Sequence, residues 1–70
     1  MTNVDLNTIK KLRKKHGLSQ KEMAQVIGSN TVYPYHRKET GIQKFTADDI
    51  YLLSIFFDKP LEYFFGNKVA

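Results

Sequence analysis

The stretch IKKLRKKHGLSQKEMAQVIG, residues 9–28, has the pattern of two short helices joined by a tight turn. Ile9 and Leu12 recur at helical spacing with Lys and Arg between them, and Gly17 ends the run. This pattern predicts an amphipathic helix whose apolar side faces a core. Its last turn is basic, and positive charge there stabilises the negative end of the helix dipole.

A second helix is predicted directly after this turn. Ser19 begins it, because Glu22 three residues later completes a capping-box pattern. Gly28 ends it, so the helix has only two to three turns and needs packing to persist. Its apolar stripe consists of Met23, Ala24 and Ile27.

The start of the third helix is ambiguous in the sequence. Asn30 or Thr31 can cap it, with Pro34 inside the first turn, where a missing N–H costs nothing. Alternatively, Tyr33 is the cap and Pro34 the first helical residue. Both alternatives end the helix near Thr40.

The last part of the chain predicts two more helices. Thr46 caps a fourth helix with Asp49 three residues on, and Asp58 ends it. Pro60 starts a short fifth helix. The fourth helix places Ile50, Leu53 and Phe57 in the core, and the fifth adds Leu61, Phe64 and Phe65. No long stretch alternates with period two, so we expect an all-α fold of five short helices in one domain, residues 1–70.

Charge is unevenly distributed along this chain of net charge +4. Residues 1–20 carry five basic side chains and one acidic one, whereas residues 46–70 carry two basic and four acidic. A basic N-terminal part and an acidic C-terminal part suit a protein that presents one face to a polyanion. The alternative is that the basic side chains only form the solvent-exposed face of a helix.

Several classes of protein are disfavoured by composition. The chain has no cysteine, and no apolar run approaches the roughly 18 residues that a membrane span requires. The N-terminus lacks a secretory pattern, so we expect a cytoplasmic protein without membrane contact. The two histidines, His16 and His36, have no acid–base or metal-ligand companion by spacing. We therefore expect neither an enzyme nor a metal, cofactor or small-molecule substrate.

Residues 9–28 resemble the opening of the helix-turn-helix domain shared by lambda repressor, Cro and the Xre-type regulators. The likeness continues through Lys38-Glu39-Thr40-Gly41 and Phe45-Thr46, and it covers the chain from about residue 6 to 65. It implies a lambda-repressor-like fold, with the helix-turn-helix unit at about residues 19–40 and double-stranded DNA as the partner.

The resemblance assigns roles to residues outside the third helix. Arg13 and Glu39 match a charged pair that ties the first helix to the end of the third, and a guanidinium suits such a bidentate bond. Gln20 matches a residue that holds a DNA phosphate at a helix N-terminus. The full set of expected phosphate contacts is Ser19, Gln20, Lys44 and Thr46. Such contacts fix register and carry no sequence information.

By the same resemblance, the third helix lies in the major groove and reads the DNA sequence. Its matching residues are Thr31, Val32, Tyr33, His36 and Arg37. Arg37 suits a guanine edge or a phosphate, and Val32 suits a thymine methyl group. Tyr35 is expected to point into the core. The span from Gly28 to Gly41 is one residue longer than is common, which leaves this register open by one residue.

The tetrapeptide Val32-Tyr33-Pro34-Tyr35 departs from the polar residues usual in a reading helix. An apolar, aromatic and stiff segment resembles a protein-interface anchor. The alternative to a DNA reader is therefore an anti-repressor that keeps the fold and covers the DNA-binding face of a partner repressor.

A second apolar face is expected on the fourth helix, since Leu52, Ile55 and Phe56 follow helical spacing. Tyr63 and Val69 would extend it. This candidate partner face suits a homodimer or a complex with a repressor protein, and a toxin bound by an antitoxin-like component is a third option. The tail of the chain could instead bury it. We expect a short Cro-like regulator of a phage or mobile-element switch that represses as a dimer.

Overall fold

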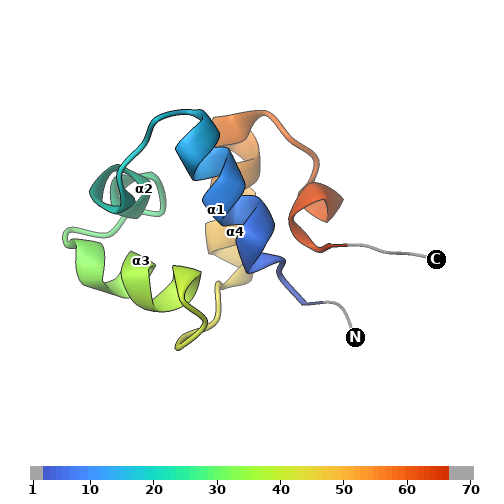
Figure 1. Cartoon of the computed structure of the whole chain (residues 1–70). Coiled ribbons are helices and arrows are strands. Elements are labelled where there is room, and N and C mark those ends of the chain that lie inside the picture. The colour runs from blue at the N-terminus through green and yellow to red at the C-terminus, as the bar shows by residue number, and fades with distance from the viewer. Residues whose placement is uncertain (1–2, 67–70) are drawn as a thin grey trace.

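The computed structural model describes residues 3–66 and contains four α-helices followed by one short 3₁₀-helix (Figure 1). The elements are α1 (Leu6–Lys15), α2 (Gln20–Val26), α3 (Val32–Glu39), α4 (Ala47–Phe57) and η1 (Leu61–Phe64). No strand occurs among residues 3–66, and the expected all-α class is confirmed. The structure has four α-helices in this range where five helices were predicted, and the predicted short fifth helix corresponds to η1. It is a four-residue 3₁₀-helix, because only a few residues separate Pro60 from the left-handed Gly66.

Side-chain caps begin most of the α-helices. The capping box of Ser19 with Glu22 is present, and so is that of Thr46 with Asp49. Asp5 caps α1 by accepting hydrogen bonds from two backbone N–H groups, a role that was not predicted. These caps satisfy N–H groups that have no partner inside their helices.

Helix α3 begins without a side-chain cap. Thr31 is its N-cap residue, so the alternative with Tyr33 as cap is wrong, but the Thr31 side chain makes no capping hydrogen bond. Pro34 is the third helical residue, where its missing N–H leaves no bond unmade. Packing rather than capping must therefore hold the start of α3.

One core joins all five elements. Its buried side chains are mostly the predicted ones: Ile9, Leu12, Met23, Ala24, Tyr35, Phe45, Ile50, Leu53, Phe57 and Phe64. Ile27 and Phe65 are only partly buried against it. Leu61 was predicted to join the core but is 48% exposed. The hydrogen bond from Asp5 N to Phe64 O (2.8 Å) anchors the other end of η1, which leaves Leu61 outside.

The helix-turn-helix pair α2–α3 lies to one side of α1, and η1 lies to the other (Figure 1). Ala24 is 1% exposed where α2 packs against its neighbours, and a small side chain there permits close approach. Gly28 has φ +80° in the turn between α2 and α3, a conformation that glycine adopts without strain. Among residues 3–66, no helix has the length and apolarity needed to cross a membrane.

We expect Phe64→Ala to lower the free energy of unfolding by about 3–5 kcal/mol, because it empties a fully buried aromatic site. Urea unfolding followed by circular dichroism at low protein concentration measures this change. The neighbouring Tyr63→Ala is the matched control, since Tyr63 is 42% exposed, and it should cost about 1 kcal/mol or less. Equal effects of the two substitutions would show that η1 does not dock as described.

Candidate nucleic-acid interface

The carboxylate of Glu39 connects α1, α2 and α3. Arg13 binds it with two donors, Nε to Oε2 at 2.8 Å and Nη2 to Oε1 at 3.1 Å, so the expected ion pair is present. Gln20 Nε2 donates to Oε1 at 2.8 Å, and Tyr35 Oη donates to Oε2 at 2.7 Å. Glu39 itself is 2% exposed. A buried carboxylate satisfied by four hydrogen bonds holds these helices in a defined arrangement.

The ionisation of this cluster follows from its contacts. Burial by itself raises the pKa of Glu39, but hydrogen bonds from Arg13, Tyr35 and Gln20 outweigh it and hold the pKa below its ordinary value. Burial, and then the hydrogen bond to Glu39, raises the pKa of the Tyr35 phenol. The hydrogen bond to Glu39 raises the pKa of Arg13. The cluster is therefore a carboxylate with a cationic donor and a neutral phenolic donor.

A second buried pair connects α3 to α4. Lys38 Nζ donates to Asp49 Oδ2, and the same oxygen accepts from Thr46 N at 2.9 Å. Asp49 was predicted only as a helix cap, and no role was predicted for Lys38. Lys38 follows Tyr35 by three residues and so shares its inward side of α3, which is the signal that could have identified it.

The predicted reading residues lie on the outward side of α3. Thr31, Val32, Tyr33 and His36 are exposed, and Arg37 is half-buried. His36 Nδ1 lies 3.0 Å from Gln20 Oε1. Because Gln20 Nε2 donates to Glu39, its Oε1 must accept, so we assign the proton to His36 Nδ1. Gln20 thus connects the buried carboxylate to the surface of α3.

Arg37 is held at the C-terminal part of this surface. Its Nη1 donates to Tyr33 Oη at 3.1 Å, and its guanidinium carbon lies 5.4 Å from the centre of the Tyr33 ring. Its Nε donates to Gln43 Oε1 at 3.3 Å. Gln43 lies outside α3 and was not among the predicted site residues. No sequence spacing identifies it, because the turn at Gly41 is what brings it back onto α3.

The four expected phosphate contacts lie at the starts of two helices. Ser19 and Gln20 begin α2, and Lys44 and Thr46 precede α4. The hydroxyls of Ser19 and Thr46 each accept a backbone N–H as caps, which leaves their own O–H groups able to donate. The contacts of Gln20 with His36 and of Gln43 with Arg37 place both helix starts beside α3.

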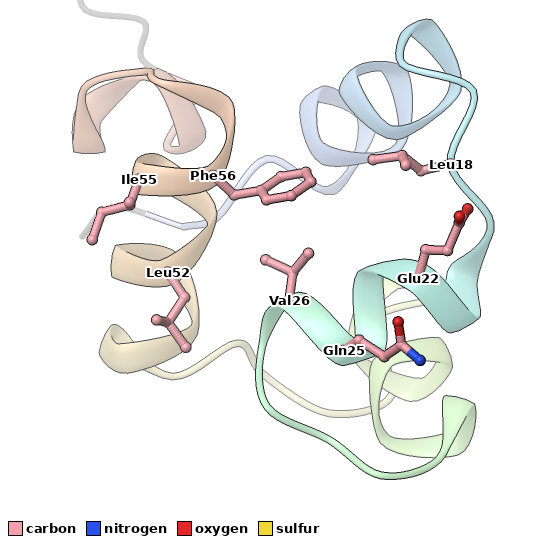
Figure 2. Close-up of a pocket in the computed structure, with 7 residues that line it drawn as sticks. All are labelled: Leu18, Glu22, Gln25, Val26, Leu52, Ile55 and Phe56. Atoms are coloured by element: carbon pink, nitrogen blue, oxygen red, sulfur yellow. The ribbon is translucent and has the colours of Figure 1, made fainter.

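The candidate partner face on α4 and η1 is exposed. The exposed fractions are 37% for Leu52, 59% for Ile55, 50% for Phe56 and 42% for Tyr63, and Val69 lies outside the described residues. In Figure 2, Phe56 points from α4 toward Leu18 and Val26, whereas Ile55 points away. A groove of about 510 Å³ lies between α2 and α4, lined by Leu18, Glu22, Gln25, Val26, Leu52, Ile55 and Phe56.

Two short helices joined at a turn, with the second helix presenting an outward polar and aromatic surface, define a helix-turn-helix domain. A family model described as helix-turn-helix matches residues 9–64. The chain belongs to this family, of the Xre and lambda-repressor type, and the predicted resemblance is confirmed. The family consists of DNA-binding transcription regulators and not of enzymes. No match was found among curated proteins or among solved structures.

We expect Glu39→Gln to lower the free energy of unfolding by about 3 kcal/mol at neutral pH, since it leaves the Arg13 cation without its charge partner. Folding lowers the pKa of Glu39 below its ordinary value of 4.5. Its contribution is therefore complete above that value and is lost as the pH falls through the lowered pKa. The difference in free energy of unfolding between the native protein and Glu39→Gln should therefore become smaller as the pH falls below 4.5.

Urea unfolding between about pH 7 and pH 3 measures this difference. Glu62→Gln is the matched control, because Glu62 is an exposed carboxylate in η1. It should change the free energy of unfolding by less than about 0.5 kcal/mol throughout. If the difference in free energy of unfolding between the native protein and Glu39→Gln stays the same down to about pH 3, the assignment of Glu39 as the buried charge is contradicted.

Proposed function

We propose that the protein is a small Cro-like regulator that acts as a single helix-turn-helix domain and binds operator DNA with the outward face of α3. The observation that carries this proposal is the Glu39 cluster. It fixes α3 against α1 and α2 through its inward residues and leaves Thr31, His36 and Arg37 facing outward. The net charge of +4 supports a polyanionic partner.

The contacts expected with DNA follow from the donors on this surface. Gln20 retains a second N–H on Nε2 for a phosphate, and the hydroxyls of Ser19 and Thr46 and the ammonium of Lys44 supply further phosphate donors. Arg37 suits a guanine edge, and Val32, 40% exposed, suits a thymine methyl group. The resemblance to short Cro-like regulators supports a place in a phage or mobile-element switch, where the protein represses.

A dimer completes this proposal. Two-fold symmetry lets two reading helices meet successive major grooves, and this requires a self-complementary surface. The candidate partner face of Leu52, Ile55, Phe56 and Tyr63 supports such a role, since each of these large apolar side chains is more than a third exposed and three of them share α4.

A second candidate function is supported by Tyr33, which is 61% exposed. An exposed aromatic on the reading surface suits an anti-repressor that covers the DNA-binding face of a partner repressor. Tyr35 is buried and cannot contribute, so the anchor would consist of Val32 and Tyr33 beside the half-buried Pro34. The polar and basic residues around them fit DNA better, and operator binding is the proposal we favour.

We expect the protein to bind a duplex from the intergenic region beside its own reading frame, with a clear preference over a scrambled duplex. Fluorescence anisotropy at about 50 and 200 mM salt should show affinity falling by orders of magnitude, because several phosphate contacts release counterions. Gln20→Ala and Arg37→Ala should weaken binding with helicity intact. Asn7→Ala is the matched control, since Asn7 is exposed on α1 and belongs neither to the predicted DNA contacts nor to the candidate partner face.

The same variants separate the two candidate functions. For a DNA reader, Tyr33→Ser should cost less than about tenfold in operator affinity. For an anti-repressor, Tyr33→Ser should abolish the complex with the repressor encoded beside it, and Gln20→Ala should matter little. Weak duplex binding without preference by the folded protein would count against operator binding.

We expect Ile55→Glu to shift the free protein from dimer to monomer, because it places a charge in an apolar interface. Sedimentation equilibrium across a concentration series measures the shift. Ile42→Glu is the matched control, since Ile42 is 66% exposed but lies in the loop after α3, and it should leave the dimer unchanged. If both variants associate like the native protein, the partner face lies elsewhere.

A further inference from the structure

We propose that Gln43 and Tyr33 form a clamp that positions Arg37 to read a guanine, so that a loop residue helps to set the sequence preference of α3. This inference rests on the proposed operator binding and deepens it. The clamp consists of the hydrogen bond from Arg37 Nε to Gln43 Oε1 (3.3 Å) and that from Arg37 Nη1 to Tyr33 Oη (3.1 Å). The Tyr33 ring adds a cation–π contact at 5.4 Å.

The clamp holds Arg37 and leaves some of its N–H donors available for DNA. A guanidinium has five N–H donors, and the two contacts use one on Nε and one on Nη1. Within residues 3–66, no hydrogen bond engages Nη2 of Arg37. The remaining donors on Nη1 and Nη2 can form the planar fork that matches O6 and N7 of guanine in the major groove.

The backbone keeps the two halves of the clamp together. The N–H groups of Ile42 and Gln43 both donate to the carbonyl oxygen of Arg37, at 2.9 and 3.1 Å. The loop therefore folds back onto the residue whose side chain Gln43 holds. Tyr33 lies one helical turn before Arg37 and reaches it along the same side of α3.

This arrangement gives the unusual aromatic of α3 a role within DNA reading. A long, flexible arginine loses considerable side-chain entropy when it is fixed against a base. Contacts that fix it before binding reduce that loss and restrict the directions from which the fork can approach. Tyr33 and Gln43 are thus positioning residues, and Arg37 is the residue that meets the base.

The clamp is first tested in the free protein by nuclear magnetic resonance. Arg13 and Arg37 are the only arginines, so two Nε–H signals are expected in the ¹⁵N spectrum. Gln43→Ala should shift the Arg37 signal and speed its exchange with water, while the Arg13 signal, bound to Glu39, stays in place. Ile42→Ala, in the same loop, is the control and should move neither signal. An Arg37 signal unchanged by Gln43→Ala overturns the clamp.

Its role in reading is tested with duplexes selected from a random-sequence library by the native protein. We expect Arg37→Ala to lose roughly 5- to 150-fold discrimination at one G·C pair. Gln43→Ala and Tyr33→Phe should each lose about three- to tenfold discrimination at that same pair and leave other positions unchanged. In the Arg37→Ala background, Gln43→Ala should have no further effect.

The outcomes are distinguishable. Effects of Arg37→Ala and Gln43→Ala that simply add, or a loss spread evenly over all base pairs, would overturn the positioning role while leaving operator binding intact. If the native protein selects no sequence at all, the proposed function and the reading role fail together, and the Arg37 Nε signal alone then reports whether the clamp exists.

Discussion

The buried carboxylate of Glu39 is the interaction on which the arrangement of the helices depends. Removing a charge from water costs several kcal/mol unless it is paired and hydrogen-bonded. The donors that offset this cost come from Arg13 on α1, Gln20 on α2 and Tyr35 on α3 itself. The carboxylate is satisfied only when these helices stand in one arrangement, so the cluster favours that packing over others that would bury similar apolar area.

The same cluster connects the interior to the outward side of α3. Gln20 uses one end of its amide for Glu39 and the other for His36, so the orientation of an exposed ring is determined by a buried charge. The pair of Lys38 with Asp49 extends this pattern to α4, where Asp49 also holds the backbone at Thr46. Both helix starts that flank α3 are thereby held by groups that also fix α3. Such rigidity would favour the proposed binding of a stiff duplex, since little ordering of α3 and its neighbours would remain to be done on binding.

How much of the fold and of the candidate site could be predicted from the sequence depends on how far apart along the chain the interacting residues lie. The capping box of Ser19 needs a partner only three residues away, and the apolar stripes repeat within one helix, so both were visible in the sequence. The partners of Glu39 include one 26 residues away, and that pair was expected only through the family resemblance. Spacing could not reveal the contact of Gln43 with Arg37, because it depends on how the chain folds back after Gly41. Lys38 was missed because a lysine is ordinarily assigned to the solvent side.

In α3, the residues that hold the helix in place differ from those that face outward. Thr31 provides no side-chain cap, and the helix begins with apolar and aromatic residues and a proline, so local sequence contributes little to its stability. Its inward residues hold it instead. Tyr35 and Glu39 belong to the Glu39 cluster, and Lys38 binds Asp49 on α4. Tyr33, on the outward side, is 61% exposed and bonds Arg37 of the same helix, so it does not itself hold α3 against α1, α2 or α4. An aromatic there changes what the helix can bind without changing how the helix is held.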